Sequence, residues 1–459
     1  MTTDVDLVRV IAAVRFGLGA GSRDMALMGR DPRGWLIDQI EIPAPQPEPL
    51  LSEEGRRDLD RFYETRRAEI AARAGKNPEL AEEKRREKRM ALSGIRKTVA
   101  AAAMDDLGRA VATRQPFRER LSRFWGNHFA VVPKNVDTAG LLPNFEEVTI
   151  RPHVTGRFED MLVAVAGHPA MQFFLDNDMS VGTASKVGMM KGLGQNENLA
   201  REILELHTLG VDGGYTQEDV IALSSALTGW TVGSKTDRWS PSFRGARHEP
   251  GPVTVLGKTY NQRGEDQLRT ILHDLSMHPA TARHLCRKLL RHFSSDKPGR
   301  AEIEELSSVY LASGGDLAAV VRALVVMDAP WRTPFSKLKQ PMDFVASSLR
   351  ALDIVPDERL AALALEYQEL MGQPALEPPG PQGWGDTMED WNDPSSLLRR
   401  AEWSLVAAAA AGDRVEPMEA AIRNFGPAFG DEVRDAMLRA ESREAAAAIF
   451  LASPLFQRR

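Results

Sequence analysis

Residues 116–129 read PFRERLSRFWGNHF, and this stretch decides the fold class. Its large apolar residues recur at intervals of four, three and one positions: Phe117, Leu121, Phe124 and Trp125. This spacing places them on one face of a helix with about 3.6 residues per turn. Strand patterns are few, and VTVLG at 253–257 is the best of them. The sequence therefore predicts a mainly α protein: a large multi-helix globular bundle with long Pro/Gly loops and at most one or two short hairpins.

The composition is that of an ordinary globular protein and excludes several classes of site. The chain of 459 residues is 43% hydrophobic and 27% charged, so disorder is not expected. Its net charge of −6 argues against a dedicated nucleic-acid binder. The single cysteine, Cys286, excludes an internal disulfide and a cysteine-only zinc site. Any bound metal must therefore be held by nitrogen and oxygen ligands.

The sequence contains no stretch that resembles a membrane span or a secretory signal. Only five apolar residues separate Arg9 from Arg15, whereas a signal peptide needs about seven or more in its hydrophobic region. No segment approaches the roughly 18 apolar residues of a transmembrane helix. We therefore expect a cytoplasmic protein from the chain as written. Export with a partner, or after removal of a leader, stays open.

We expect three segments that form one integrated body. Residues 1–110 comprise N-terminal helices, a proline-rich linker at 41–50 and a charged helical arm. Residues 111–355 form a central helical core that carries the motifs, and 356–459 contain a Trp/Pro/Gly loop followed by helices. The charged arm mixes both signs, as in EEKRREKR at 82–89, which is typical of a solvated helix and also suits docking of an acidic partner.

His128 is the first candidate site residue. On a helical wheel it lies within about 20° of Phe117, so it continues the apolar face. Partial burial lowers the pKa of an imidazole and favours its neutral form, which can accept a proton or ligate a metal. Trp125 and Asn127 stand beside it and are candidate cofactor contacts. The competing interpretation is a core histidine with a backbone hydrogen bond.

A second candidate is the helix predicted over about twelve residues between Asn196 and Gly210, in NENLAREILELHTLG. Set on a wheel, its acidic side chains lie on one flank, which spans about 140°, and His207 lies on the other side at about 280°. Acid–base chemistry is therefore predicted for a set of five: His128, Arg201, Glu202, Glu205 and His207. The competing interpretation is a plain solvated face. A straight helix cannot bring Glu202 and His207 to one metal, so other segments would have to contribute ligands.

Two further clusters carry candidate residues. His248 precedes Glu249 in a turn and is a candidate metal ligand, although most such pairs are surface features. The predicted metal set is His128, His207, His248 and Glu197. Trp384 and Trp391 occupy the Pro/Gly loop near the C-terminal helices, where they could form an aromatic ligand platform or simply anchor the loop.

Taken together, the motifs resemble a large bacterial family known as domain of unknown function 1800. The matching stretches are 15–19, 124–129, 150–153 with Gly156 and Phe158, 169–171, 175–177, 196–202, 205–211, 214–217, 219–220, 227–230, 278–282 and 383–384. The resemblance implies a mainly helical fold. It also implies a sulfatase- or phosphatase-like partner encoded nearby, and it supplies no reaction. This chain differs from the family pattern at Glu249, where aspartate is usual, and it lacks the export signal that many relatives carry.

Three functions compete at this point, and the sequence leaves open whether the protein is an enzyme. The first is an enzyme with a His/Glu-lined site, with a divalent metal as its possible cofactor. The second is a non-catalytic scaffold or accessory subunit for the implied partner. The third, ranked below the metal enzyme, is a haem-binding protein like a peroxidase, with His207 as the proximal residue and Arg123, Trp125 and His128 as the distal group. The substrate and the oligomeric state are not determined by the sequence.

Overall fold

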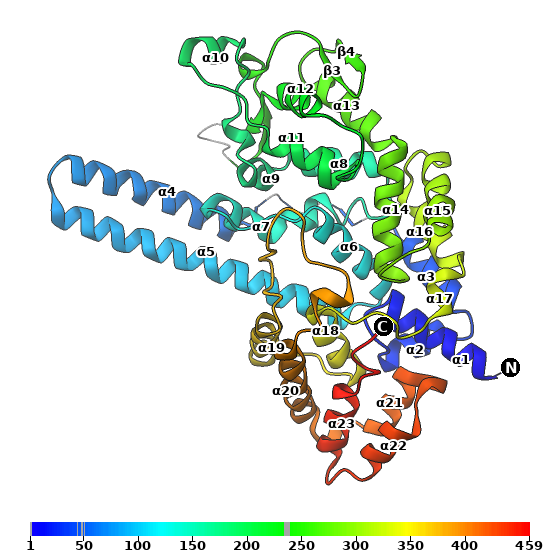
Figure 1. Ribbon diagram of the computed structural model, residues 1–459. Helices are drawn as coiled ribbons and strands as arrows, with labels where there is room; N and C mark the ends of the chain where they lie inside the picture. Colours follow the sequence, from blue (N-terminus) through cyan, green and yellow to red (C-terminus); the bar gives the residue numbers. More distant parts are fainter. Residues whose placement is uncertain (1, 44, 47–48, 50, 234–238) are drawn as a thin grey trace.

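The computed structural model describes residues 2–43, 45–46, 49, 51–233 and 239–459, so part of the proline-rich segment 41–50 lies outside it. The protein is mainly α, as predicted (Figure 1). The strands of the described chain form two antiparallel pairs: β1 (Trp230–Val232) with β2 (Pro241–Phe243), and β3 (Val253–Val255) with β4 (Lys258–Tyr260). Among the described helices, none combines the length and apolar character that a membrane crossing requires.

The N-terminal part ends in a long helical hairpin that projects from the body (Figure 1). Its elements are α1 (Thr2–Ile11), η1 (Ala12–Phe16), α2 (Ser22–Met28), α3 (Pro32–Glu41), α4 (Glu53–Ala74) and α5 (Pro78–Ala112). The last two form the hairpin and contain the predicted charged arm. Glu69 of α4 is buried between them, where it pairs with Lys88 and Arg73. The charges of the arm are therefore partly used to join its own two helices.

The central part carries most of the motifs. Its first elements are α6 (Pro116–His128), α7 (Val136–Thr149), α8 (Phe158–Gly167), α9 (Pro169–Phe174), η2 (Asn177–Met179), α10 (Lys186–Lys191), α11 (Asn198–Glu202), η3 (Ile203–His207) and α12 (Gln217–Leu227). They are followed by η4 (Gly245–Arg247), α13 (Glu265–Ser276), α14 (Pro279–Phe293), α15 (Arg300–Ala312), α16 (Leu317–Val326) and α17 (Ala329–Arg332). Residues 158–174 form the helices α8 and α9, with Pro169 at the start of the second helix.

The C-terminal part is a group of helices below the hairpin in Figure 1. It comprises α18 (Pro341–Ala351), α19 (Glu358–Leu370), η5 (Met388–Asp390), α20 (Pro394–Ala411), η6 (Gly412–Arg414), α21 (Pro417–Phe425), η7 (Gly426–Ala428), α22 (Asp431–Leu438) and α23 (Arg443–Ala452). The loop at 372–387, which contains Trp384, leaves this group and runs back in front of α6 and α7. The division into three segments stays a prediction.

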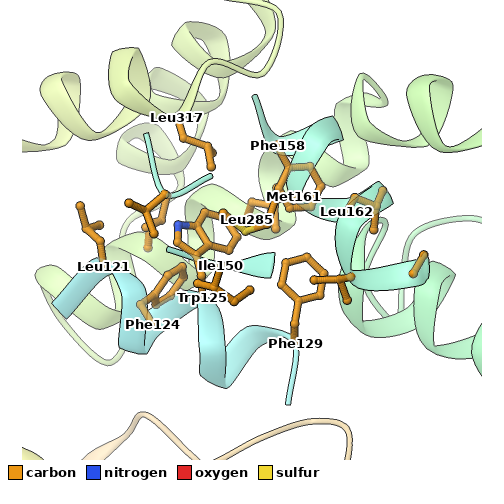
Figure 2. Packing of buried hydrophobic residues seen from close by; sticks show 14 of the residues in the cluster. Leu121, Phe124, Trp125, Phe129, Ile150, Phe158, Met161, Leu162, Leu285 and Leu317 are labelled. Carbon is orange, nitrogen blue, oxygen red and sulfur yellow. The ribbon is translucent and has the colours of Figure 1, made fainter. Parts of the chain in front are cut away.

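The buried apolar side chains form a large cluster in the central part and a smaller one among the C-terminal helices. Helix α6 lies in the large cluster, as its apolar periodicity predicts. Figure 2 shows Trp125 packed among Phe129, Phe158 and Leu285, and its ring centroid lies 5.7 Å from that of Phe158. Burial of such aromatic rings is worth roughly 2–3 kcal/mol each. This packing fixes α6, and with it His128 at the C-terminal end of the helix.

Candidate functional site

His128 is buried at the end of α6 and uses both of its ring nitrogens. Its Nε2 lies 3.2 Å from the carbonyl oxygen of His207, and its Nδ1 lies 2.9 Å from Nζ of Lys288. A neutral ring that donates from Nε2 to the carbonyl and accepts at Nδ1 from the ammonium satisfies both contacts. Burial lowers the pKa of His128 well below its usual range, and the charge of Lys288 adds to this effect. His128 is therefore a neutral acceptor that holds Lys288.

The predicted helix between Asn196 and Gly210 forms as two pieces, α11 and the π-helix η3. A helix that ends leaves its last carbonyl groups without partners inside the helix. Here the carbonyl oxygens of Leu206 and His207 lie 3.0 Å and 3.2 Å from Nε2 of His284 and His128, respectively. The two imidazoles therefore cap the end of η3. Short π-helical segments of this kind are frequent at functional sites.

His207 lies in the same cluster but has no polar partner. Its side chain is 1% exposed, and neither ring nitrogen forms a hydrogen bond with a described residue. The rings of Phe129 and His128 lie 5.0 Å and 6.1 Å away. Burial lowers the pKa of His207 to about 3, so the ring is neutral at physiological pH. The structure thus brings together two of the predicted histidines and adds His284 and Lys288 to them.

A cavity of about 540 Å³ opens on the other side of Lys288. One of its walls is the helix α14, whose polar side chains recur every three or four residues over an arc of about 140°. We call this set the basic face, and it consists of Arg283, His284, Arg287, Lys288 and Arg291. The opposite side of α14 is apolar and buried, with Leu285, Leu289 and Phe293. Core packing therefore orients the basic face toward the cavity.

The arginines of the basic face have no carboxylate counter-ion among the described residues. Within the part of the chain that the structure describes, no carboxylate forms an ion pair with Arg283, Arg287 or Arg291. Burial lowers the pKa of Lys288 to about 8, which Arg291 reinforces and Asp386 opposes. A cluster of unpaired cations repels itself, and a bound anion would relieve this repulsion.

Three carboxylates line the cavity: Asp212 is exposed, and Asp343 and Asp386 are paired with cations outside the basic face. Asp343 accepts hydrogen bonds from Arg120 at 2.8 Å and from Arg459 at 2.9 Å. Asp386 is 2.8 Å from Nδ1 of His292 and also pairs with Arg459, at 3.2 Å. Arg120, Asp343, His292 and Arg459 are buried and Asp386 is half-buried, and all of them except Arg459 line the cavity. Asp343 and Asp386 are thus engaged with other cations and form no ion pair with the arginines of the basic face.

The loop that carries Trp384 closes another wall of the cavity. Asn127 donates a hydrogen bond to the carbonyl oxygen of Trp384 at 2.9 Å and accepts one from its backbone N–H at 2.7 Å. Gly383 has φ +72°, and a Cβ there would lie 2.2 Å from the carbonyl oxygen of Asn127. Trp391 packs on Trp384 with ring centroids 5.9 Å apart and donates to Gly385. Asn127 and Trp384 therefore line the cavity together, and Trp391 anchors the loop.

The remaining predicted residues lie elsewhere. Trp125 is in the core and does not line the cavity. We call Glu197, Glu202 and Glu205 the acid flank; none of them lines the cavity either. Glu197 pairs with Arg201 at 3.1 Å and accepts from Gln217 at 2.8 Å, and Glu205 accepts from Tyr215 at 3.2 Å. Burial raises the pKa of Glu202, as does Glu205 beside it.

The predicted metal set is only partly assembled. His248 lies in a turn, where its Nδ1 is 2.8 Å from the carbonyl oxygen of Thr228, and Glu197 is engaged with Arg201. Among the described residues, no group of three or more His, Cys, Asp or Glu side chains is placed to hold a metal ion. The roles of His128 and His207 as metal ligands, and of His207 in haem binding, stay predictions.

The basic face was the feature that sequence reasoning missed. The spacing of Arg283, Arg287 and Arg291 at i, i+4 and i+8 is visible in the sequence and predicts one helical face. That spacing alone is also typical of a solvated helix. It indicates a binding site only when it is known that the arginines line a cavity and form no ion pair with a described carboxylate.

Comparison with known proteins gives a family and no function. A family model described as "Protein of unknown function (DUF1800)" matches residues 11–458. No curated protein and no solved structure matches the chain.

Proposed function

The chain belongs to the DUF1800 family, and we propose that its cavity binds a small, multiply charged anion with phosphate, sulfate or carboxylate groups. The observation that carries the proposal is the basic face of α14, whose arginines line a cavity and form no ion pair with any carboxylate that the structure describes. Guanidinium groups bind such oxyanions through paired, charge-assisted hydrogen bonds. The volume of about 540 Å³ is within the usual range for a small-molecule site.

We further propose that the protein is an enzyme that uses Lys288 as its acid–base residue. A lysine with a pKa of about 8 exchanges its proton near neutral pH, which an ordinary lysine does not do. His128 would act as a positioning residue, because its Nδ1 is 2.9 Å from Nζ of Lys288 while its Nε2 is held by a backbone carbonyl. In this arrangement, proton transfer would occur at Nζ, next to an anion held by the arginines.

Calorimetric titration with pyrophosphate tests the binding proposal. We expect saturable binding to the full chain that weakens as the salt concentration rises, because exposed charge pairs are screened. Arg287→Gln should weaken it about tenfold or more, the usual value of a hydrogen bond to a charged group. Arg201→Gln is the matched control, since Arg201 belongs to a surface ion pair outside the cavity. No binding, or equal losses in both variants, would contradict the proposal.

A divalent metal at His207 is the second candidate, because neither ring nitrogen of this buried side chain has a hydrogen-bond partner among the described residues. The measurement is the metal content of the purified protein, alone and after chelation. Stoichiometric metal that is lost in His207→Ala and retained in His248→Ala would favour a site at the histidine cluster. Metal-free protein that still binds pyrophosphate would reject the metal and leave the anion site standing. A partner of the sulfatase or phosphatase type stays a prediction.

A further inference from the structure

A second, smaller cavity of about 120 Å³ lies between the helices α5, α6, α7 and α19 and the loop that carries Trp384. Most of its lining is apolar, including Ala102, Ala130, Leu142, Phe145, Leu365 and Leu376. It contrasts with the first cavity, whose lining is rich in arginine. A space of this kind favours an uncharged, apolar group of a ligand.

Glu146 is the one carboxyl group in this cavity that the fold leaves without a described partner. Its neighbour Glu147 pairs with Arg109 and Arg151, and Asp106 pairs with Arg123 at 2.6 Å. No hydrogen bond or ion pair joins the Glu146 carboxyl to another described residue. Its Oε1 lies so close to α6 that a Cβ at Gly126 would be 2.4 Å away.

The environment of Glu146 favours its protonated form. Burial raises its pKa to about 7, and the negative charge of Asp106 adds to this, whereas Arg151 and Arg123 oppose it. A protonated carboxyl both donates and accepts hydrogen bonds. It is therefore suited to a hydroxyl or carbonyl group of a ligand, and an unpaired second anion there would be unfavourable.

The two cavities share a wall. Five residues line both of them: Arg123, Asn127, Met342, Gln373 and Trp384. The partition between the cavities is formed by Asn127 and by the loop segment that it holds through its two hydrogen bonds to Trp384. The two cavities are therefore adjacent across these five residues.

We propose that the second cavity binds the uncharged part of the same ligand, which makes the substrate an amphipathic anion. Its chemical class is an organic phosphate, sulfate or carboxylate with a short apolar body that ends in a hydroxyl or carbonyl group. The charged group lies at Arg283, Arg287 and Arg291, and the terminal oxygen lies at Glu146. This inference rests on the proposed anion site and adds the identity of the ligand's other end.

A series of alkyl phosphates tests the inference. Binding of methyl, ethyl, butyl and hexyl phosphate to the full chain is measured by calorimetry at one pH, with pyrophosphate as the reference. We expect the affinity to rise about fourfold for each methylene buried, until the cavity is full. Ala102→Leu places extra carbon atoms in the second cavity, so it should cancel the gain from chain length and leave pyrophosphate binding unchanged. Ala100→Leu, at an exposed position of the same helix, is the matched control.

The outcomes separate the two proposals. Pyrophosphate binding combined with equal affinities across the alkyl series overturns the amphipathic ligand and keeps the anion site. A gain from chain length that survives Ala102→Leu places the alkyl group elsewhere and also overturns the inference. No binding of any probe overturns the proposed function itself. The wild-type series is decisive even if Ala102→Leu fails to fold. The wild-type protein should bind 4-hydroxybutyl phosphate more tightly than butyl phosphate, because Glu146 can form a hydrogen bond with the hydroxyl group. This difference in affinity should disappear in Glu146→Leu.

Discussion

The acid flank and the basic face are two helical surfaces with similar densities of charge and different surroundings. On the acid flank, Glu197 is engaged with Arg201 and Gln217, and Glu205 with Tyr215. On the basic face, the arginines border a cavity and have no described carboxylate partner. A high density of charge on a helical surface therefore does not by itself identify a binding site. A charged group becomes a candidate for binding when the fold gives it access to a cavity and withholds its counter-ion.

Reversing the charges on each surface is the strongest test of whether only the basic face binds the anion. Arg283→Glu combined with Arg287→Glu should weaken pyrophosphate binding more than about 100-fold, because each lost contact to a charged group costs about 1.5–3 kcal/mol. Glu197→Lys combined with Glu205→Lys changes the net charge by the same amount in the opposite direction. We expect it to alter binding less than about twofold, since these residues do not line the cavity. Both double variants are compared by calorimetry.

Changes in pyrophosphate affinity of equal size in the two double variants would show that binding depends on the overall charge of the protein rather than on the basic face. Circular dichroism and thermal unfolding provide the control for folding. The basic face is expected to tolerate the reversal, because its arginines are not buried in the core and pair with no described acid. New pairs between the introduced glutamates and Arg291 would even relieve part of the repulsion within this face.

A smaller loss of anion binding is expected when Asn127, which holds the Trp384 loop at the cavity, is replaced. Asn127→Ala removes both hydrogen bonds to Trp384 and leaves the backbone groups of the loop partly unsatisfied. The free energy of unfolding should fall by about 1–3 kcal/mol, and pyrophosphate binding should weaken about tenfold because the loop is less ordered. Chemical denaturation and calorimetry measure the two quantities. Unchanged binding in a destabilised protein would show that the basic face works without this wall.

Much of the fold was predictable because helical periodicity is a local property of the chain. The apolar spacing of residues 116–129 predicted the buried face of α6, and the few strand signals predicted the short hairpins. The pairing of Asn127 with Trp384 was not predictable, since 257 residues separate them and only the packed chain brings them together. The segment 196–210 was predicted as one α-helix. Its second half is a π-helix instead, and the carbonyl groups at the end of that π-helix contact His128 and His284, which lie on helices distant in the sequence.

The same distinction between local patterns and long-range contacts explains why the structure brings together only some of the predicted site residues. His128 and His207 were chosen for their position beside apolar stripes, and burial brings them together as that position implies. The acid flank was chosen for its density of carboxylates, but its partners Gln217 and Tyr215 lie beyond the segment. Lys288 was overlooked because its unusual pKa arises from burial near His128 and Arg291, which no local pattern reveals.

The smallest expected effect on anion binding comes from the loss of a single charge of the basic face, that of Lys288. Methanedisulfonate is a suitable probe because its own charge is constant between pH 7 and 9. Lys288, with a pKa of about 8, is mostly protonated at pH 7 and mostly neutral at pH 9. Binding should therefore weaken about fivefold over this range, as one cation of the site is lost. The measurement is calorimetry at several pH values and constant ionic strength.

The sign of this dependence follows from the groups that face Lys288. His128, His207 and His284 have pKa values lowered by burial, so they stay neutral across the range. Asp386 has a lowered pKa and stays ionised, and the guanidinium of Arg291 stays charged. Only Lys288 among these groups changes its charge. Lys288→Arg keeps a permanent cation at the position and should give a flat profile, whereas a profile that still falls in this variant would assign the titration to another residue.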